Sequence, residues 1–508
     1  MQKDIVNKNS SASAEYDADY EKNVNPITEG VIWKQLLLYF FPMLLSSFFQ
    51  QLYNTADAMI VGRAAGKEAL SAVGGSAGSV LGVFMMFYIG FAGGAAVLAA
   101  QYYGARREAA LRTAVRRSLF ISMILGAAGL FICFVFASSI LRVMHTPEDV
   151  FLPSLWYLRI AALGMVSNSL YNMGASALRA VGDVRRPLAI LIFTCLCNIG
   201  LDLFFVAGLQ MGAPGAALAT IICQTISALL ALWCLRRAVF LPSAMLPAEA
   251  EADDESSTDR YPAEQVPDSP SEQALGTAAK NARDARVSKD ITGRILRMGL
   301  PLGFTEVMYT FANVVLMAAV NSFGTDTVAA YAAYGKIDAI FWMIVGSFGI
   351  SITTFVGQNI GAGRWDRVMQ SIRDCALMMF ASLGVVIVIL YMGAETLQGL
   401  FCSDPDVVAI GVKMMHFLMP FYVLYIPIEV LFGALRGMGN SLAPTLLTFF
   451  GVCVLRSAWG IFMVPLHHTV NMVLMGFPVT WVTTSIAFAI YFVWYIRRQK
   501  EGQRRAVL

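Results

Sequence analysis

The sequence predicts an all-α polytopic membrane protein with twelve transmembrane helices, arranged as two six-helix bundles that are related by a parallel internal repeat. Composition, the spacing of apolar stretches and the recurrence of motifs lead to this prediction. Of the 508 residues, 57% are hydrophobic and only 14% are charged, whereas a soluble protein carries about 25% charged residues. The mean hydropathy is +0.62. A single soluble domain could not bury so much apolar surface, so we expect lipid to surround the chain.

Twelve stretches are long and apolar enough to cross a bilayer, which takes about 20 residues. They cover residues 33–61, 71–101, 117–143, 151–178, 187–208, 214–236, 294–322, 328–358, 369–397, 407–435, 443–465 and 470–496. None of them alternates apolar and polar residues with a period of two, which excludes a transmembrane β-barrel.

Basic residues are unequally divided between the two sets of loops. Arginines gather after the second, fourth, sixth, eighth and tenth stretches, whereas the opposite loops contain only Arg63, Lys67 and Arg142. Loops that retain Lys and Arg stay in the cytoplasm. We therefore expect both termini to be cytoplasmic and the protein to be a multi-pass protein of the plasma (inner) membrane.

Changes in composition divide the chain into five parts. We expect a polar cytoplasmic tail at 1–30, an N-terminal lobe at 31–240, a linker at 241–290, a C-terminal lobe at 291–500 and a basic cytoplasmic tail at 501–508. The linker is acidic, contains Pro and Ser and has few large apolar residues. Such a composition predicts disorder and a tethering role.

The two lobes repeat each other at a nearly constant offset. The run Gln101–Ala105 matches Gln358–Ala362, and Leu178–Asp183 matches Leu435–Asn440, both 257 residues apart. Each repeat has six spans, so both insert the same way up. Their symmetry axis then lies along the membrane normal, with a substrate path between them. Two unequal halves in one chain favour a transporter over a channel.

Several motifs resemble those of the multidrug and toxic compound extrusion (MATE) transporters. They are Pro42 with YNTADAMIVG at 53–62, QYYGA at 101–105, LRAVGD at 178–183 and NIGLD at 198–202. The resemblance covers residues 31–500 apart from the linker. It implies a V-shaped pair of bundles around a central cavity. It also implies an antiporter that exports small organic compounds, amphipathic or cationic, in exchange for H⁺ or Na⁺.

The resemblance implies a cation-coupling site in the N-terminal lobe, formed by Asp57, Asn198, Asp202 and Thr220. Their positions in the sequence agree with a single site. Asp57 lies six residues before Arg63, Asp202 six residues before Gly208 and Thr220 six residues after Pro214, near the outer ends of their spans, which is a depth of about 9 Å. Their oxygen atoms suit a hard cation such as Na⁺. The alternative is that Asp57 and Asp202 are interfacial residues wetted from outside.

The C-terminal lobe has its own candidate polar or substrate residues, namely Glu306, Asp338, Glu429 and Arg456. Glu306 and Glu429 could form a second cation site, or could be solvated by the cytoplasm or the cavity. Asp338 is expected to form a structural ion pair with Arg456. Pro42 and Pro301 are expected to kink the first and seventh spans, because proline removes a helix hydrogen bond.

Other classes of function find little support in the sequence. The eight cysteines show no zinc-ligand spacing and the four histidines form no HExxH motif, so we expect no enzyme and no metal beyond Na⁺ at Asp57, Asn198, Asp202 and Thr220. We expect no cofactor other than the coupling ion, no nucleic-acid partner, and a monomer that contacts small-molecule substrates and the bilayer. The alternative function is a flippase or exporter of a lipid-linked or other amphiphilic metabolite, which would need a strongly basic cavity.

Overall fold

The computed structural model describes residues 25–240 and 270–507, which fold into helices joined by short connections. The expectations for residues 1–24, 241–269 and 508 lie outside this range. The first half contains α2 (Pro26–Glu29), α3 (Ile32–Ala64), α4 (Gly66–Gly74), α5 (Ser76–Gly104), α6 (Glu108–Val135), α7 (Ala137–Val143), α8 (Glu148–Ala162), α9 (Met165–Ala180), α10 (Arg185–Asp202), η1 (Leu203–Gly208), α11 (Gly212–Leu235) and η2 (Arg236–Phe240). The second half contains α12 (Pro270–Asn321), α13 (Thr325–Gly361), α14 (Trp365–Met392), α15 (Ala394–Gly399), α16 (Pro405–Leu418), η4 (Met419–Tyr425), α17 (Ile426–Gly437), α18 (Leu442–Thr448), η5 (Phe449–Val454), α19 (Leu455–Ala458), η6 (Trp459–Met463), α20 (Val464–Leu466) and α21 (Val470–Val507).

The described part of the chain has eleven helices that are long and apolar enough to cross a membrane, and a twelfth span if α8 and α9 are counted as one. These two helices meet at an angle of 48°. Gly164 lies at the break, and a Cβ there would come within 2.5 Å of Gln224 Oε1 on α11. The glycine thus lets α11 approach the bend. The twelve expected spans are therefore present, with the fourth one broken.

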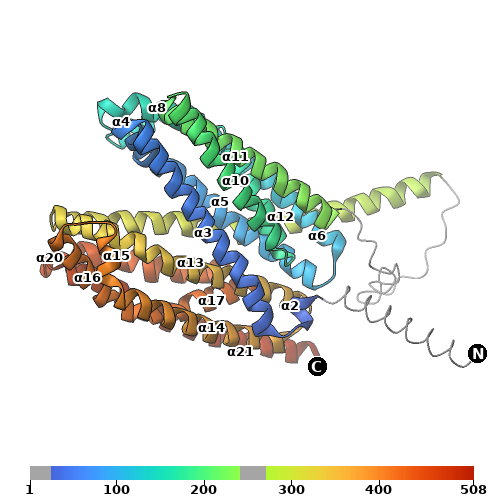
Figure 1. The fold of residues 1–508 in the computed structure, drawn as a ribbon. Helices are drawn as coiled ribbons and strands as arrows, with labels where there is room; N and C mark the ends of the chain where they lie inside the picture. The colour runs from blue at the N-terminus through green and yellow to red at the C-terminus, as the bar shows by residue number, and fades with distance from the viewer. Residues whose placement is uncertain (1–24, 241–269, 508) are drawn as a thin grey trace, which may run out of the picture.

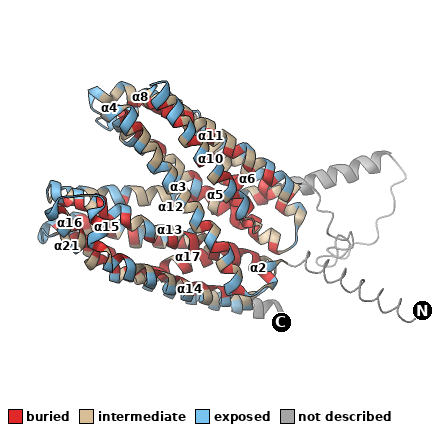
Figure 2. Ribbon diagram, in the orientation of Figure 1, coloured by how far each residue is buried: buried red, intermediate tan, exposed pale blue. Residues whose placement is uncertain are grey.

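The helices form two lobes that meet at one end and diverge toward the other (Figure 1). We call the end with α2 and the last turns of α5 and α13 the closed end, and the end with α4, α8 and α20 the open end. The arginine-rich loops after α5 and α13 belong to the closed end. Many large apolar side chains are exposed, among them Phe131 (61%) and Phe462 (64%), and exposed residues occur along the helices of both lobes (Figure 2). Such a surface suits contact with lipid chains.

The first and seventh spans are exchanged between the lobes at the closed end. Ile32, Leu36 and Phe40 of α3 belong to the hydrophobic core of the C-terminal lobe, whereas Val61 further along α3 packs in the N-terminal lobe. Correspondingly, Ile295 of α12 packs against α5 in the N-terminal lobe. The boundaries expected at 31–240 and 291–500 therefore describe the lobes along the chain but not in space, because each lobe holds the start of the other's first helix.

Pro42 and Pro301 lie in the regions where these two helices pass from one lobe to the other. Both prolines are inside helices that continue on either side. A hydroxyl one turn further on bonds to the proline carbonyl in each case, Ser46 Oγ to Pro42 O at 2.8 Å and Thr305 Oγ1 to Pro301 O at 2.9 Å. The two crossings are therefore built alike.

Two expected segment boundaries are wrong. The linker was expected to be disordered through residue 290, but α12 begins at Pro270. Residues 274–286 contain five alanines, the strongest helix former, and proline is favoured in a first helical turn. The polar tail was expected to extend to residue 30, but residues 26–29 form α2, where Ile27 and Thr28 are buried.

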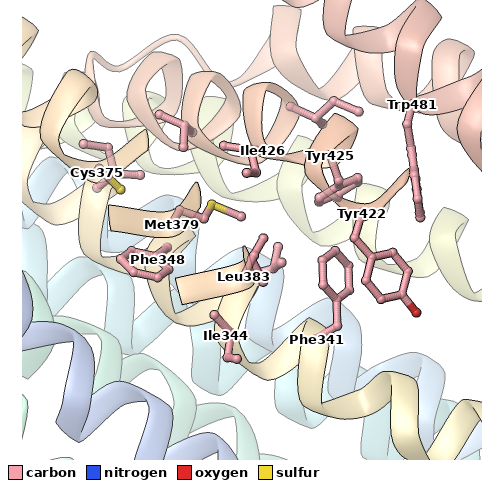
Figure 3. Close-up of a cluster of buried hydrophobic side chains, with 14 of the residues drawn as sticks. Phe341, Ile344, Phe348, Cys375, Met379, Leu383, Tyr422, Tyr425, Ile426 and Trp481 are labelled. Carbon is pink, nitrogen blue, oxygen red and sulfur yellow. The ribbon is translucent and has the colours of Figure 1, made fainter. Parts of the chain in front are cut away.

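The core of the C-terminal lobe is rich in aromatic rings. Phe341 on α13 stacks on Tyr422, with ring centroids 4.0 Å apart, and Trp481 on α21 completes the cluster (Figure 3). Trp481 is 1% exposed. These rings fix α13, η4 and α21 relative to one another, and so hold the wall of the central cavity in place.

Candidate functional site

The four residues of the expected cation site come together in the N-terminal lobe. Asp57 lies on α3, Asn198 and Asp202 lie in the last turns of α10, and Thr220 lies on α11. The carboxyl groups of Asp57 and Asp202 lie close enough to interact electrostatically. Asn198 and Asp202 are fully buried. The buried position of Asp202 speaks against the alternative of an interfacial residue wetted from outside.

The local backbone explains how these side chains converge. Asn198 and Asp202 are one helical turn apart and therefore share a face of α10. Asp202 is the last residue of α10, and the next six residues form the π-helical segment η1. Such widened turns are frequent at functional sites. Tyr53, one turn before Asp57, donates from its hydroxyl to Thr220 Oγ1 at 3.4 Å and so ties α3 to α11.

The buried oxygen atoms of this cluster have no hydrogen-bond donor in the described part of the protein. They are Asp57 Oδ1, both carboxylate oxygens of Asp202, and the side-chain oxygen of Asn198. No Lys, Arg or His of the described residues forms an ion pair with either carboxylate. Buried polar atoms normally have partners, and two adjacent carboxylates repel each other. A proton or a bound Na⁺ would remove both penalties.

A separate, larger cavity lies between the lobes and has a volume of about 740 Å³. Helices from both halves line it. Its charged lining residues are Arg179, Glu306, Asp338, Glu429, Arg436 and Arg456. Asp57 and Asp202 are not among the lining residues, and Thr220 instead borders a small cavity of about 30 Å³ inside the N-terminal lobe. The carboxylate pair and the central cavity are therefore distinct sites.

Glu306 and Glu429 line the central cavity. Of the two surroundings expected for these carboxylates, the cytoplasm or the cavity, the structure shows the cavity. Arg436 lies within electrostatic range of both carboxylates. Its guanidinium donates to Thr353 Oγ1 at 2.7 Å. Sequence reasoning did not select Arg436 as a site residue, although its match with Arg179 in the repeat was a usable signal.

The ion pair expected between Asp338 and Arg456 does not form. Asp338 accepts a hydrogen bond from Trp342 Nε1 at 2.8 Å and another from the Tyr422 hydroxyl. Arg456 instead donates to Thr480 Oγ1 at 3.1 Å. Both side chains line the cavity, but nearby aromatic donors satisfy the carboxylate first. Trp342 lies one turn further along α13, a spacing visible in the sequence, whereas Tyr422 comes from η4 and could not be found from spacing.

The repeated motifs join the two lobes at the closed end by reciprocal hydrogen bonds. Gln101 Nε2 donates to Gly437 O at 2.9 Å, and Gln358 Nε2 donates to Ala180 O at 2.7 Å. The donors are 257 residues apart in the sequence, and so are the acceptors. Each glutamine is thus bonded to the motif of the other lobe.

Two glycines allow the lobes to approach so closely. A Cβ on Gly104 would lie 2.0 Å from Gln358 O, and one on Gly361 would lie 1.9 Å from Gln101 O. Small residues permit such backbone contact between membrane helices. Tyr39 adds a further bridge, because its hydroxyl contacts Arg179 O at 2.9 Å and Thr354 Oγ1 at 3.1 Å.

The short helix α2 fills the closed end between the lobes. Asn25 Nδ2 donates to Gln358 Oε1 at 3.0 Å, and Arg367 donates to Gly30 O at 2.6 Å. On the other side, Glu29 forms an exposed ion pair with Arg106 at 3.0 Å. The segment therefore touches both lobes.

The fold has two lobes of helices that diverge like the arms of a V, a cavity between them and a closed end built from a repeated motif. These features define a polytopic membrane transporter fold. The family model MatE matches residues 42–204 and again residues 301–462, which together make up more than half of the chain. The chain belongs to the MatE family. This confirms both the resemblance and the predicted fold class, and the two matches coincide with the two repeats.

Several known proteins that resemble this chain over most of its length have multidrug resistance in their names. The chain is 27% identical over 467 residues to the "Probable multidrug resistance protein YoeA" of Bacillus subtilis, covering 90% of this chain and 91% of the relative. It is 25% identical over 449 residues to the "Probable multidrug resistance protein NorM" of Thermotoga maritima, covering 84% of each. A solved structure described as the outward-facing conformation of a multidrug resistance MATE family transporter superposes with a TM-score of 0.78 at 20% identity, covering 94% of this chain and 99% of the other.

Proposed function

We propose that this protein is a secondary antiporter that exports small amphipathic compounds, with H⁺ or Na⁺ entering in exchange. The central cavity receives the exported compound, and the pair Asp57–Asp202 receives the cation, with Asn198 and Thr220 as additional oxygen ligands. The multidrug resistance names of the relatives support the substrate class. The closed end, with its arginine-rich loops, faces the cytoplasm in this account.

The observation that carries this proposal is the isolation of the two carboxylates. They interact with each other, Asp202 is fully buried and Asp57 has one buried oxygen, and neither has a basic partner among the described residues. Carboxylates inside a membrane protein are costly and are usually functional. Because they lie outside the central cavity, the cation and the exported compound occupy different sites, and their exchange requires a conformational link.

Helix α3 supplies this link in the proposal. It carries Asp57 in the N-terminal lobe and Tyr39 at the closed end, where the Tyr39 hydroxyl bridges Arg179 O and Thr354 Oγ1. The two residues are 18 positions apart, about 27 Å along a helix. A cation that draws Asp57 toward Asp202 changes the packing of α3 on α10 and α11. This shifts the equilibrium between closed and opened ends.

The experiment uses the full-length protein reconstituted into liposomes that contain a fluorescent cationic dye. A Na⁺ gradient and a pH gradient are imposed separately, and dye movement is recorded for each. We expect one of the gradients to drive dye against its concentration difference. Dye movement that follows only its own gradient, in the presence of either cation gradient, would contradict antiport.

A further inference from the structure

Arg456 is the one fully buried charged side chain of the central cavity among the described residues. It lies on α19, a single helical turn between the π-helical segments η5 and η6, and is 3% exposed. It also lines the 740 Å³ cavity. Burying a guanidinium without a counter-ion is costly. The position therefore needs either a structural partner or a ligand.

The partners of Arg456 leave most of its donors unused. A guanidinium has five N–H donors, but the hydrogen bond from Arg456 to Thr480 Oγ1 is one contact at 3.1 Å. Its Nε has no partner in the described structure. On one side its Cζ lies 4.4 Å from the ring centroid of Phe477, a cation–π contact that holds the side chain without using the N–H groups.

No carboxylate of the described residues forms an ion pair with Arg456. Asp338, the acidic group expected to do so, accepts hydrogen bonds from Trp342 and Tyr422. Arg436 provides the contrast within the same cavity. Its guanidinium donates to Thr353 Oγ1 and lies within electrostatic range of Glu306 and Glu429. Arg436 thus lies between two carboxylates, whereas the carboxylate within electrostatic range of Arg456 is Asp338, whose hydrogen bonds come from Trp342 and Tyr422.

Aromatic rings surround the free side of Arg456. Tyr309, Tyr331 and Tyr425 lie within electrostatic range of its guanidinium, and all three line the cavity together with Trp342 and Phe477. The hydroxyls of Tyr309 and Tyr425 are 3.2 Å apart. A planar guanidinium matches a carboxylate with two parallel hydrogen bonds, and the rings offer faces on which a flat apolar body can stack.

We propose that Arg456 is the residue that anchors a carboxylate group on an aromatic substrate. This inference rests on the proposed export function, since the site lies in the transport cavity. It assigns recognition of the substrate's carboxylate to the side chain of Arg456. The carboxylate of the substrate accepts hydrogen bonds from guanidinium N–H groups, such as Nε–H, that have no acceptor among the described residues.

A matched pair of dyes tests this assignment: a rhodamine with a free benzoate, and the methyl ester of the same rhodamine, which lacks the anion. Binding of each dye is measured on the purified full-length protein by quenching of tryptophan fluorescence. Active transport of each is measured in liposomes. The variants are Arg456→Gln, which removes the charge, and Arg456→Lys, which keeps the charge but loses the planar fork. Arg142→Gln, an exposed arginine on α7 at the open end, is the control.

We expect Arg456→Gln to weaken binding of the free acid by about ten- to a hundredfold, the worth of a hydrogen bond to a charged group, and to change binding of the ester by less than about twofold. Arg456→Lys should lie between wild type and Arg456→Gln. Retained ester binding also shows that the variant is folded. Arg142→Gln should bind both dyes as the wild type does.

Other outcomes overturn the assignment. Equal loss of both dyes in Arg456→Gln would show a structural role, and unchanged binding of the acid would show that its anion is held elsewhere. Binding of the ester but not of the acid by the wild type would rule out an anion anchor. Failure of the proposed function has a different signature: Arg456-dependent binding of the acid, with no gradient-driven movement of either dye.

Discussion

The two lobes have the same helical framework but carry different charges. Pro42 and Pro301 are 259 residues apart, and at this offset Asp57 corresponds to Leu316. At the offset of 257 residues that aligns the other motifs, Asp202 corresponds to Trp459. In the other direction, Glu429 corresponds to Asn172 and Asp338 corresponds to Leu81. The repeat therefore preserves the crossings and the closed end, where both lobes must fit each other, while each lobe has its own buried acids.

The acids of the two lobes also differ in their surroundings. Asp57 and Asp202 have unpartnered oxygens, whereas Asp338 is hydrogen-bonded to two aromatic residues and Glu429 lies near Arg436. A group that is already compensated by the protein gains little from a cation. The comparison teaches that the N-terminal lobe is the one able to exchange a cation, and that the C-terminal lobe shapes the cavity.

The largest effect is expected from the carboxylate pair. Asp57→Asn and Asp202→Asn should each reduce gradient-driven efflux by about a hundredfold or more, since an intramembrane carboxylate is removed. The double variant should be little worse than either single one, because the two groups act as a unit. Efflux is measured at matched reconstitution, with Asp326→Asn, an exposed acid at the start of α13, as control.

Near-normal coupled efflux in both single variants would move the cation site to Glu306 and Glu429. The same assay with Glu429→Gln then becomes decisive. If efflux losses of the two aspartate variants multiply in the double variant, the residues act independently and the shared site is wrong.

The next largest effect is expected at the closed end, which both lobes share. Gly104→Ala and Gly361→Ala each place a Cβ within 2.0 Å of a backbone carbonyl of the other lobe, so the ends cannot meet as they do now. Overpacking of this kind costs about 1–3 kcal/mol, and efflux should fall about tenfold.

The measurement for these glycines is dye efflux together with labelling of a cysteine at position 353, in the cavity near the closed end. Reagent added from the arginine-rich side should reach it faster in both variants. Gly384→Ala is the matched control, because a Cβ there has no neighbour within 4 Å. A variant that labels and transports like wild type would show that the glycine contacts are not needed for closure.

A smaller effect is expected from the reciprocal glutamines. Gln101→Ala and Gln358→Ala each leave a buried carbonyl without its donor, at a cost of about 1–3 kcal/mol. The two should not be equal, because Gln358 also accepts from Asn25 of the α2 segment. Labelling rates from the arginine-rich side should therefore rise more for Gln358→Ala, and equal rates would show that α2 adds nothing to the closed end.

The smallest effect is expected at the one ion pair between α2 and the N-terminal lobe. Glu29 and Arg106 are exposed, and exposed pairs contribute about 0–1 kcal/mol. Glu29→Gln should change efflux by less than about twofold. A large loss of efflux, with the protein still folded by thermal unfolding, would assign this pair a part in gating.

The sequence predicted the spans and the repeat, and it placed Asn198 and Asp202 on one helix. These properties depend on local composition and on spacing along one helix, as with Asn198 and Asp202. The resemblance to known transporters supplied the grouping of Asp57 with Thr220, which the structure brings together.

Features that depend on contacts between distant helices could not be predicted. The hydropathy of the sequence does not show that the starts of α3 and α12 pack in opposite lobes, because both lobes offer an apolar core to these helices. Asp338 was paired with the wrong partner because the Tyr422 hydroxyl reaches it only through the packing of η4 on α13, although its other donor, Trp342, lies one turn away on the same helix. The structural role of Asn25–Gly30 was missed for the same reason, since polar residues before a first span usually indicate a free tail.

The most direct test of the central claim measures cation entry and dye exit in the same liposomes and reports the number of cations exchanged for each dye molecule. With one of the two cations, H⁺ or Na⁺, the wild-type protein should show a fixed number of cations exchanged for each dye molecule. Asp338→Asn should keep that ratio even if its transport rate is lower. Asp57→Asn combined with Asp202→Asn should show no cation entry coupled to dye, although downhill dye movement through the cavity can persist. A double variant that still exchanges cation for dye at the wild-type ratio would contradict the assignment of coupling to the N-terminal lobe.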